Sequence, residues 1–188
     1  MVADFDGTGE QTVATVNRGS ISGWLSDDVL LLTARTTPGT LERVLYSLSV
    51  PSGELTELAR AENLRGQTTS PDGAWIAYYV APNPDPSENG LWLMRSDGSE
   101  QLQVPPELFG AYQWRDEYRL LIVPFRPTAE SHELWEFDVT TQQTRRLTDP
   151  EITPFKINDG DWAVSPDGQK VVFVSAQDRN LRLLSLPE

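Results

Sequence analysis

Short apolar runs separated by polar turns recur along the whole chain. The runs are rich in Val, Ile, Leu and aromatic residues, as at 29–32, 74–78 and 118–123. Runs of β-branched and aromatic residues that are bounded by Gly, Pro, Asp and Ser are typical of strands. We therefore expect an all-β chain built from short strands.

One phrase of the sequence occurs twice. Ser-Pro-Asp-Gly stands at 70–73 and again at 165–168, and each copy precedes a run of strand-forming residues. Ser suits the first position of a type I turn, Pro fixes φ at the second, and Gly accepts a positive φ at the fourth. Each copy therefore predicts a tight hairpin between two strands.

Two weaker copies fall in the same register, beginning at Trp24 and at Trp114. Thr69 and Val164 take the place of this Trp in the two full copies, so the successive intervals are 45, 45 and 50 residues. A regular period of this length indicates a repeat architecture. Because the weaker copies lack the Pro and the Gly, we expect their hairpins to be longer or shaped differently.

A second apolar element follows each anchor, and a polar turn with a further short strand follows the first three of these elements. Each repeat is thus predicted to contain four short strands, which is the pattern of a propeller blade. The second elements stand at 45–48, 91–94, 134–137 and 181–184, and the further strands at 55–58, 101–104 and 144–148.

The segment 54–62 also fits a helix, because Leu55, Leu58 and Ala59 follow the i, i+3, i+4 spacing of a helical face. The repeat register predicts a strand at the same place. We follow the register here, since three other repeats agree with it.

These residues resemble the TolB-like, WD-repeat-like propeller family, whose hallmark is a Ser-Pro-Asp-Gly turn after an aromatic residue and before an apolar strand. The resemblance covers about 20–186 and is complete only in the second and fourth repeats. It implies an all-β propeller of about four four-stranded blades, and commonly a role in binding a protein or another ligand. It implies no reaction, and it favours an extracytoplasmic or secreted location.

The repeat predicts a single propeller domain over 1–188. Asp6-Gly7-Thr8 resembles the turn at 97–99, so residues 11–16 would supply the fourth strand that the last blade lacks. Three arrangements stay open: a closed four-bladed monomer, a ring made of two copies, or a segment of a larger propeller. The expected parts are a closing strand at 1–18 and blades at 19–64, 65–107, 108–157 and 158–188, the last one incomplete.

Charge and composition exclude several classes of partner and site. The 188 residues carry a net charge of −13, from 28 acidic and 15 basic residues, and no basic cluster exceeds the pair Arg145-Arg146. A nucleic acid or an anionic membrane requires a basic patch, so neither partner is expected. The absence of Cys excludes disulfides and thiolate metal sites. No apolar run reaches the ~18 residues of a membrane span, so no direct membrane insertion is expected.

Two short motifs resemble catalytic or metal-binding sequences. Residues 4–8, Asp-Phe-Asp-Gly-Thr, resemble the first motif of haloacid-dehalogenase-type phosphotransferases, but no alternating strand and helix pattern surrounds them. The segment 158–161, Asn-Asp-Gly-Asp, lacks the ligand spacing of a Ca²⁺ loop. We interpret both segments as turns between strands, and we expect no cofactor and no metal site.

The single histidine and the tryptophans are candidates for binding or catalysis. His132 lies in a predicted loop, and the chain contains no Gly-x-Ser-x-Gly motif, so we expect a solvated surface residue. One His also excludes a zinc site built from several histidines. Several of the six Trp residues recur at equivalent repeat positions, so we expect most of them to pack between sheets.

Loops that a rigid scaffold carries are where recognition residues accumulate. The loop at 105–112 carries Phe109 and Tyr112, and the loop at 149–158 carries Phe155. Exposed aromatic residues on such loops are suitable anchors for a partner. We therefore predict that these three residues bind a protein or peptide.

The leading hypothesis from the sequence is a non-catalytic propeller scaffold that binds a protein or peptide through its loop face. A homodimer is an open alternative to the monomer. No coherent catalytic set is present, so the chain is predicted not to be an enzyme. The alternative function is the accessory, gating propeller of a prolyl-oligopeptidase-like peptidase or of another multidomain enzyme.

Overall fold

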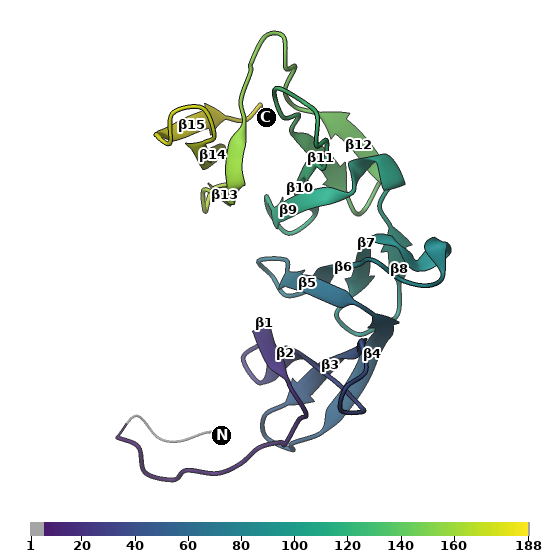
Figure 1. Cartoon of the computed structure of the whole chain (residues 1–188). Coiled ribbons are helices and arrows are strands. Elements are labelled where there is room, and N and C mark those ends of the chain that lie inside the picture. The colour runs from purple at the N-terminus through teal and green to yellow at the C-terminus, as the bar shows by residue number, and fades with distance from the viewer. Residues whose placement is uncertain (1–5, 188) are drawn as a thin grey trace. The chain divides into compact units, whose positions relative to one another are not determined.

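The apolar runs form β-strands in the computed structural model, which describes residues 6–187 apart from the side chain of residue 159 (Figure 1). The strands belong to four sheets, and within each sheet they are ordered as they are in the chain. The chain divides into two compact units, Met1–Leu102 and Gln103–Glu188. The predicted all-β fold with four sheets is therefore confirmed.

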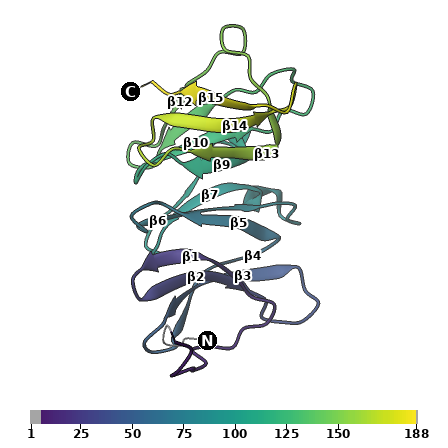
Figure 2. The same cartoon turned by 90° about the vertical axis from the view of Figure 1, so that its left-hand side faces the viewer.

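The first unit contains the first two sheets, with the last strand of the second sheet at its boundary. Figure 2 shows this unit from a second side; in both of its sheets, strands that follow one another in the chain are hydrogen-bonded neighbours. The first sheet consists of β1 (Ser20–Ser26), β2 (Val29–Ala34), β3 (Glu42–Ser49) and β4 (Leu55–Glu62). The second consists of β5 (Leu64–Thr69), β6 (Trp75–Val80), β7 (Gly90–Arg95) and β8 (Gln101–Gln103), with the short helix η1 (Pro86–Glu88) before β7.

The second unit contains the other two sheets. The fourth sheet has three strands within the described residues, whereas the other sheets have four. After the short helix η2 (Pro106–Leu108), the third sheet consists of β9 (Gly110–Trp114), β10 (Arg119–Pro124), β11 (Trp135–Asp138) and β12 (Gln143–Arg146). The fourth consists of β13 (Ile157–Val164), β14 (Lys170–Ser175) and β15 (Leu181–Ser185).

The segment with helix-like spacing is a strand, as the repeat register predicted. It forms β4, which pairs antiparallel with β3 so that Leu55 lies opposite Leu48 and Ala59 opposite Leu45. Leu58 packs, partly buried, against the core of the first unit. Pairing and burial therefore determine the conformation here, because they outweigh a modest helix propensity.

The anchor positions of the repeat are structurally equivalent. Trp24 pairs with Leu30 and Trp114 pairs with Leu120 across the first hairpin of their sheets. In the two complete copies, the pairs are Thr69 with Ile76 and Val164 with Val171. The hairpins that lack Pro and Gly are thus one residue shorter between the paired positions, and not longer.

The two Ser-Pro-Asp-Gly turns have the same hydrogen bonds. The hydroxyl of Ser70 donates to the Asp72 carboxylate at 2.5 Å and accepts from the backbone N–H of Trp75 at 2.9 Å. Ser165 makes the same two bonds, to Asp167 at 2.5 Å and from Lys170 at 2.9 Å. The Ser and the Asp together therefore close each turn and align the strand that follows.

Each unit has an apolar core between its two sheets. In the first unit, Leu31 and Leu45 of the first sheet pack in one cluster with Ile76 and Tyr78 of the second. In the second unit, the corresponding cluster joins Leu121 and Val123 of the third sheet to Val171, Phe173 and Trp162 of the fourth. The side chains on alternate faces of each strand thus bury one sheet against the next.

The predicted closing strand does not form an extended strand over residues 12–16. Val13 and Ala14 instead pack against Leu32, Ala34 and Leu48 of the first sheet. Pairing of this segment with the fourth sheet of the same chain would join the two units, and it stays a prediction.

Candidate functional site

A pocket of about 300 Å³ lies in the second unit, at the end of the third and fourth sheets that carries their long loops. We call it the His132 pocket. Its walls come from the start of β9, from the end of β10, from the loop that follows β10, and from β13 with the residue before it. The lining residues are Ala111, Val123, Pro124, Phe125, Arg126, Pro127, His132, Lys156, Ile157, Gly160 and Trp162.

Backbone hydrogen bonds hold the loop after β10 against its neighbours. The N–H of Phe125 donates to the carbonyl of Phe109 at 2.9 Å, which extends the pairing of β10 beyond its last residue. The N–H of His132 donates to the carbonyl of Phe155 at 2.7 Å. Hydrogen bonds to neighbouring segments therefore hold the loop at Phe125 and at His132. The side chains of the residues between these two positions are carried on a backbone that is fixed at both ends.

His132 is half-buried and hydrogen-bonded. Its Nδ1 accepts the backbone N–H of Ile157 at 3.1 Å, and its ring meets the ring of Phe155 edge-to-face at 6.1 Å between centroids. Burial lowers the pKa of His132 below its ordinary value, and the charge of Lys156 lowers it further. The neutral imidazole therefore carries its proton on Nε2.

Two cations line the pocket beside this neutral imidazole. Lys156 Nζ donates to the carbonyl of Ala129 at 2.8 Å, and Arg126 Nη2 donates to the carbonyl of Glu107 at 2.7 Å. Each bond is to a neutral carbonyl, so it orients the cation without neutralising its charge. Together the two cations give this pocket a positive character in a chain whose net charge is −13.

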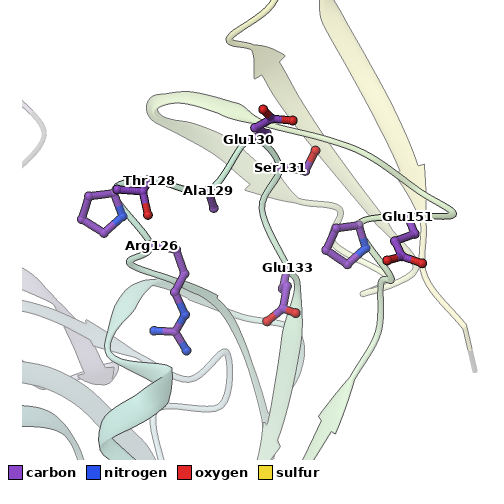
Figure 3. Close-up of a pocket in the computed structure, with 9 residues that line it drawn as sticks. Arg126, Thr128, Ala129, Glu130, Ser131, Glu133 and Glu151 are labelled. Carbon is purple, nitrogen blue, oxygen red and sulfur yellow. The ribbon is translucent and has the colours of Figure 1, made fainter.

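A second pocket of about 540 Å³ adjoins the first and shares Arg126 and Pro127 with it. We call it the glutamate pocket, because Glu130, Glu133 and Glu151 line it. Figure 3 shows that Glu130 and Glu133 come from one loop and Glu151 from a segment across the pocket. Glu133 also forms an ion pair with Arg146 at 3.4 Å, at the base of its loop.

The three aromatic residues that the sequence singled out have different environments. Phe155 is only 6% exposed and packs against the ring of Phe173 in the core of the second unit. Its ring contacts the ring of His132, and almost none of its surface is accessible to a partner. Phe109 and Tyr112 are partly exposed near the His132 pocket but do not line it, and their role in binding stays a prediction.

Phe125 is an exposed aromatic residue that the sequence did not single out. It is 68% exposed and lines the His132 pocket. It follows directly after the apolar strand β10, so it reads as a continuation of that strand in the sequence. The prediction of a solvated surface His132 is corrected in part, because the side chain is half-buried. The backbone N–H of Ile157 and the ring of Phe155 contact its imidazole.

The six tryptophans differ in their burial. Trp75, Trp114 and Trp162 are buried, and Trp92 and Trp135 are partly buried, so the prediction of core packing is confirmed for most of the set. Trp24 is exposed. Its position on β1 is equivalent to the buried Trp114, so an equivalent place in the repeat does not guarantee burial.

Only one of the two motifs interpreted as turns is a turn. Residues 158–161 lie within β13, where the pairing with β14 shifts in register, so the interpretation of that segment as a turn was wrong. Asp6 accepts hydrogen bonds from the N–H and the hydroxyl of Thr8, as in an ordinary Asx turn, whereas Asp4 lies outside the described residues. Within residues 6–187, no group of three or more His, Asp or Glu side chains is placed to hold a metal ion. None of the helices in this part of the chain is long and apolar enough to cross a membrane.

The titration of His132 predicts a pH-dependent stability. Just below pH 6.5, the ordinary pKa of histidine, His132 is protonated in the unfolded chain. In the folded chain its pKa is lower, so the side chain is still neutral at that pH. The free energy of unfolding should therefore fall as the pH is lowered through 6.5, and the loss should end below the folded pKa. Urea unfolding across this range measures it. In the matched variant His132→Asn, which keeps an acceptor for Ile157, this dependence should disappear; parallel curves for both proteins would contradict the assignment.

Solved structures with the same fold are numerous, although no protein-family model matches the chain and no curated protein matches it in sequence. An oligogalacturonate lyase in complex with manganese is 18% identical, with a TM-score of 0.61 over 99% of this chain and 71% of its own. A second oligogalacturonate lyase, from Vibrio parahaemolyticus, is 12% identical, with a TM-score of 0.67 over 98% of this chain and 59% of its own. A putative TolB from Agrobacterium tumefaciens is 20% identical, with a TM-score of 0.59 over 87% of this chain and 56% of its own.

These similarities confirm the predicted TolB-like β-propeller fold. At such low identity they show the fold alone. The chain spans between about half and three quarters of the length of these three proteins.

The prediction that the chain is not an enzyme is corrected by the same comparisons, because two of these neighbours are lyases. Enzymes and other proteins share this fold, so the repeat and the fold it predicts do not exclude catalysis. One of these neighbours binds manganese.

This chain has one histidine, and its described residues contain no group of three His, Asp or Glu side chains that could ligate a metal, so they do not fit such an ion.

Proposed function

We propose that this chain is a propeller scaffold that binds a segment of a protein partner in the His132 pocket and the adjoining glutamate pocket. The observation that carries the proposal is the opposite charge of two pockets that share Arg126 and Pro127. A peptide presents acidic, basic and apolar side chains in close succession, so a single segment can fill both pockets.

The apolar part of the site supplies a place for an anchor residue. Phe125 stands exposed at the rim, and Pro124 and the buried Trp162 form part of the wall below it. Binding energy at protein interfaces is concentrated on a few apolar or aromatic side chains that enter such pockets. An apolar side chain of the partner would therefore contact Phe125 and Trp162.

The charged part of the site determines the neighbours of this anchor. Arg126 and Lys156 would attract an acidic group on the partner, and Glu130 and Glu151 would attract a basic group on the other side of Arg126. We expect the bound segment to carry an acidic residue and a basic residue on either side of an apolar one. Phe109 and Tyr112, the other aromatic residues that the sequence predicts to bind a partner, would contact such a segment where it leaves the pocket.

Selection of binders from a random displayed peptide library, followed by titration of the best synthetic peptide, tests the proposal. Phe125→Ser should weaken its binding about tenfold or more, because a rim anchor is lost. Tyr118→Ser is the matched control, since Tyr118 is also exposed but lies in the turn at the opposite end of β10. Equal losses in both variants, or none in Phe125→Ser, would show that the peptide binds elsewhere.

A second candidate ligand is an acidic oligosaccharide, which the fold of two oligogalacturonate lyases and the cations of the His132 pocket favour. The glutamate pocket argues against it, because a polyanion would meet three carboxylates there. Calorimetric titration with oligogalacturonate separates the two ligands. Saturable binding that Lys156→Gln removes, together with release of new reducing ends, would favour the sugar over the peptide.

The chain could also be the accessory propeller of a larger enzyme, whether it binds a peptide or an oligosaccharide. The propeller domain of a protease and prolyl endopeptidases are among the structures with this fold. Self-association of the chain is a separate proposal, which binding in these pockets neither requires nor excludes.

A further inference from the structure

A small pocket of about 140 Å³ lies in the first unit, between its two sheets. We call it the Tyr78 pocket. One wall is β4 of the first sheet, and the other consists of residues of β5, β6, β7 and β8 with the last residue of η1. Both sheets have four strands, and every residue that lines the pocket belongs to this unit. The pocket is therefore complete within the first unit.

Part of the lining is apolar. Leu64 and Val80 are buried in it, and Ala59 and Ala61 of β4 line it from the other sheet. An alanine side chain ends at Cβ, so β4 leaves room here between two sheets that otherwise pack closely. This part of the pocket therefore suits a short hydrocarbon chain.

The polar part of the lining carries hydrogen-bond acceptors. Gln101 donates from Nε2 to the hydroxyl of Tyr78, so its Oε1 and a further lone pair of the Tyr78 oxygen remain for another donor. Burial, together with the nearby charge of Glu88, raises the pKa of Tyr78 to about 12. The hydroxyl therefore stays neutral near pH 7, and any charge at the pocket comes from other groups.

The charge around the pocket is negative. Glu88 lines it, and no Lys or Arg among residues 6–187 forms an ion pair with this carboxylate. Arg60 also lines the pocket, but it pairs with Glu42 at 2.8 Å and with Glu57 at 2.7 Å, so two carboxylates already compensate its charge. These carboxylates outnumber the single guanidinium, and the pocket therefore favours a cation over an anion.

A hydrogen bond holds the segment of Glu88 against β7. The indole Nε1 of Trp92 donates to the backbone carbonyl of Glu88 at 2.9 Å, and the N–H of Ser87 donates to the Asp85 carboxylate at 2.9 Å. Trp92 is partly buried and lines the pocket with Glu88. An aromatic ring and a carboxylate on one fixed support are a favourable environment for an ammonium group.

We propose that the Tyr78 pocket binds a primary ammonium group carried on a short hydrocarbon chain. An ammonium has three N–H donors. Its acceptors would be the carboxylate of Glu88, the hydroxyl oxygen of Tyr78 and Oε1 of Gln101. The hydrocarbon chain would lie against Ala59 and Ala61. A free alkylamine and the lysine side chain of a partner both present this group.

Titration with n-butylammonium chloride, followed by NMR, tests the proposal. Saturable shifts are expected at the indole N–H of Trp92 and at the backbone N–H groups of 58–61, which line the pocket. The matched compound 1-butanol lacks the charge and should bind roughly tenfold more weakly or worse. The absence of saturable shifts at these groups, or equal affinities for the two compounds, would overturn the proposal.

Two variants identify the groups that hold the ammonium. Glu88→Gln should weaken the binding of n-butylammonium roughly tenfold or more, because a charged hydrogen bond is lost, and Tyr78→Phe roughly threefold or more. Glu54→Gln is the matched control, since Glu54 is an exposed glutamate before β4 that does not line the pocket. Its affinity should match that of the wild-type chain. Unchanged affinity in Glu88→Gln, or an equal loss in Glu54→Gln, would overturn the proposal.

The same titration with Nα-acetyl-lysine N-methylamide decides where the ammonium comes from. This compound carries the n-butylammonium group on a capped peptide unit. Tighter binding than that of n-butylammonium would assign the pocket to a lysine of a partner, and weaker binding would assign it to a free amine. In both cases Glu88→Gln should weaken binding roughly tenfold or more. A capped lysine whose binding does not depend on Glu88 would overturn the proposal.

Discussion

Replacing Arg115 by Met is expected to lower the free energy of unfolding by about 3–5 kcal/mol, the cost of breaking a buried ion pair from one side. Arg115 and Glu136 are both buried, with 2.5 Å between Nη1 and Oε2. The guanidinium also donates to the carbonyl of Gly168 at 2.9 Å and to that of Pro187 at 2.7 Å. Its loss would remove the buried donor of Glu136, which would keep only partly exposed cations, the nearest being Arg145 at 3.0 Å, and would take this donor from the carbonyls of Gly168 and Pro187. Three elements of the second unit would thus lose one common partner.

The comparison variant for this prediction is Arg182→Met. Arg182 also belongs to the second unit and pairs with Asp178 at 2.6 Å, but its side chain is exposed. Solvent screens such a pair, so its removal should cost about 1 kcal/mol or less. Urea unfolding of both variants measures the difference, and similar losses would mean that Arg115 does not hold the third and fourth sheets together.

Replacing Gly73 by Ala should be the second most costly change, at about 3 kcal/mol or more, from left-handed backbone strain together with overpacking. Gly73 has a φ of +72°, and a Cβ built there would overlap the carbonyl oxygen of Leu25. The last residue of the Ser-Pro-Asp-Gly turn thus packs directly against the first sheet. Gly168 repeats the arrangement in the second unit, where a Cβ would lie 2.7 Å from the carbonyl oxygen of Arg115.

The variant Gly39→Ala separates the cost of left-handed backbone strain from the cost of overpacking. Gly39 has a φ of +86°, but no atom lies within 4 Å of a Cβ built there. Its replacement should therefore cost only the backbone strain, about 1–2 kcal/mol. Thermal or urea unfolding gives both values. If the two variants lost the same stability, the close approach of the turn to Leu25 would contribute nothing.

The turn chemistry explains why so much of the fold could be predicted from the sequence. Ser, Pro, Asp and Gly each have one physical role in the turn at 70–73, and the same roles recur at 165–168. Once these turns are placed, the spacing to Trp24 and Trp114 positions the remaining hairpins. This register was strong enough to override the helical spacing in 54–62, which forms β4.

The candidate site could not be predicted in the same way, because it is built from the parts of the chain that do not repeat. The burial of Phe155 and the partly enclosed His132 depend on how two loops of different length fold over each other. Arg115 is a similar case. Its neighbours in the sequence indicate a solvated turn, whereas its partners are a glutamate and two carbonyls distant in the chain.

The most direct test of the proposed binding role is hydrogen exchange, measured by mass spectrometry, of the chain with and without the best selected peptide. Bound peptide should slow exchange in the segments 125–134 and 149–160, which form the two adjoining pockets, and Phe125→Ser should remove this protection. Exchange at the turn that contains Tyr118 should not change. Protection of that turn instead, or no protection in either pocket segment, would contradict the account.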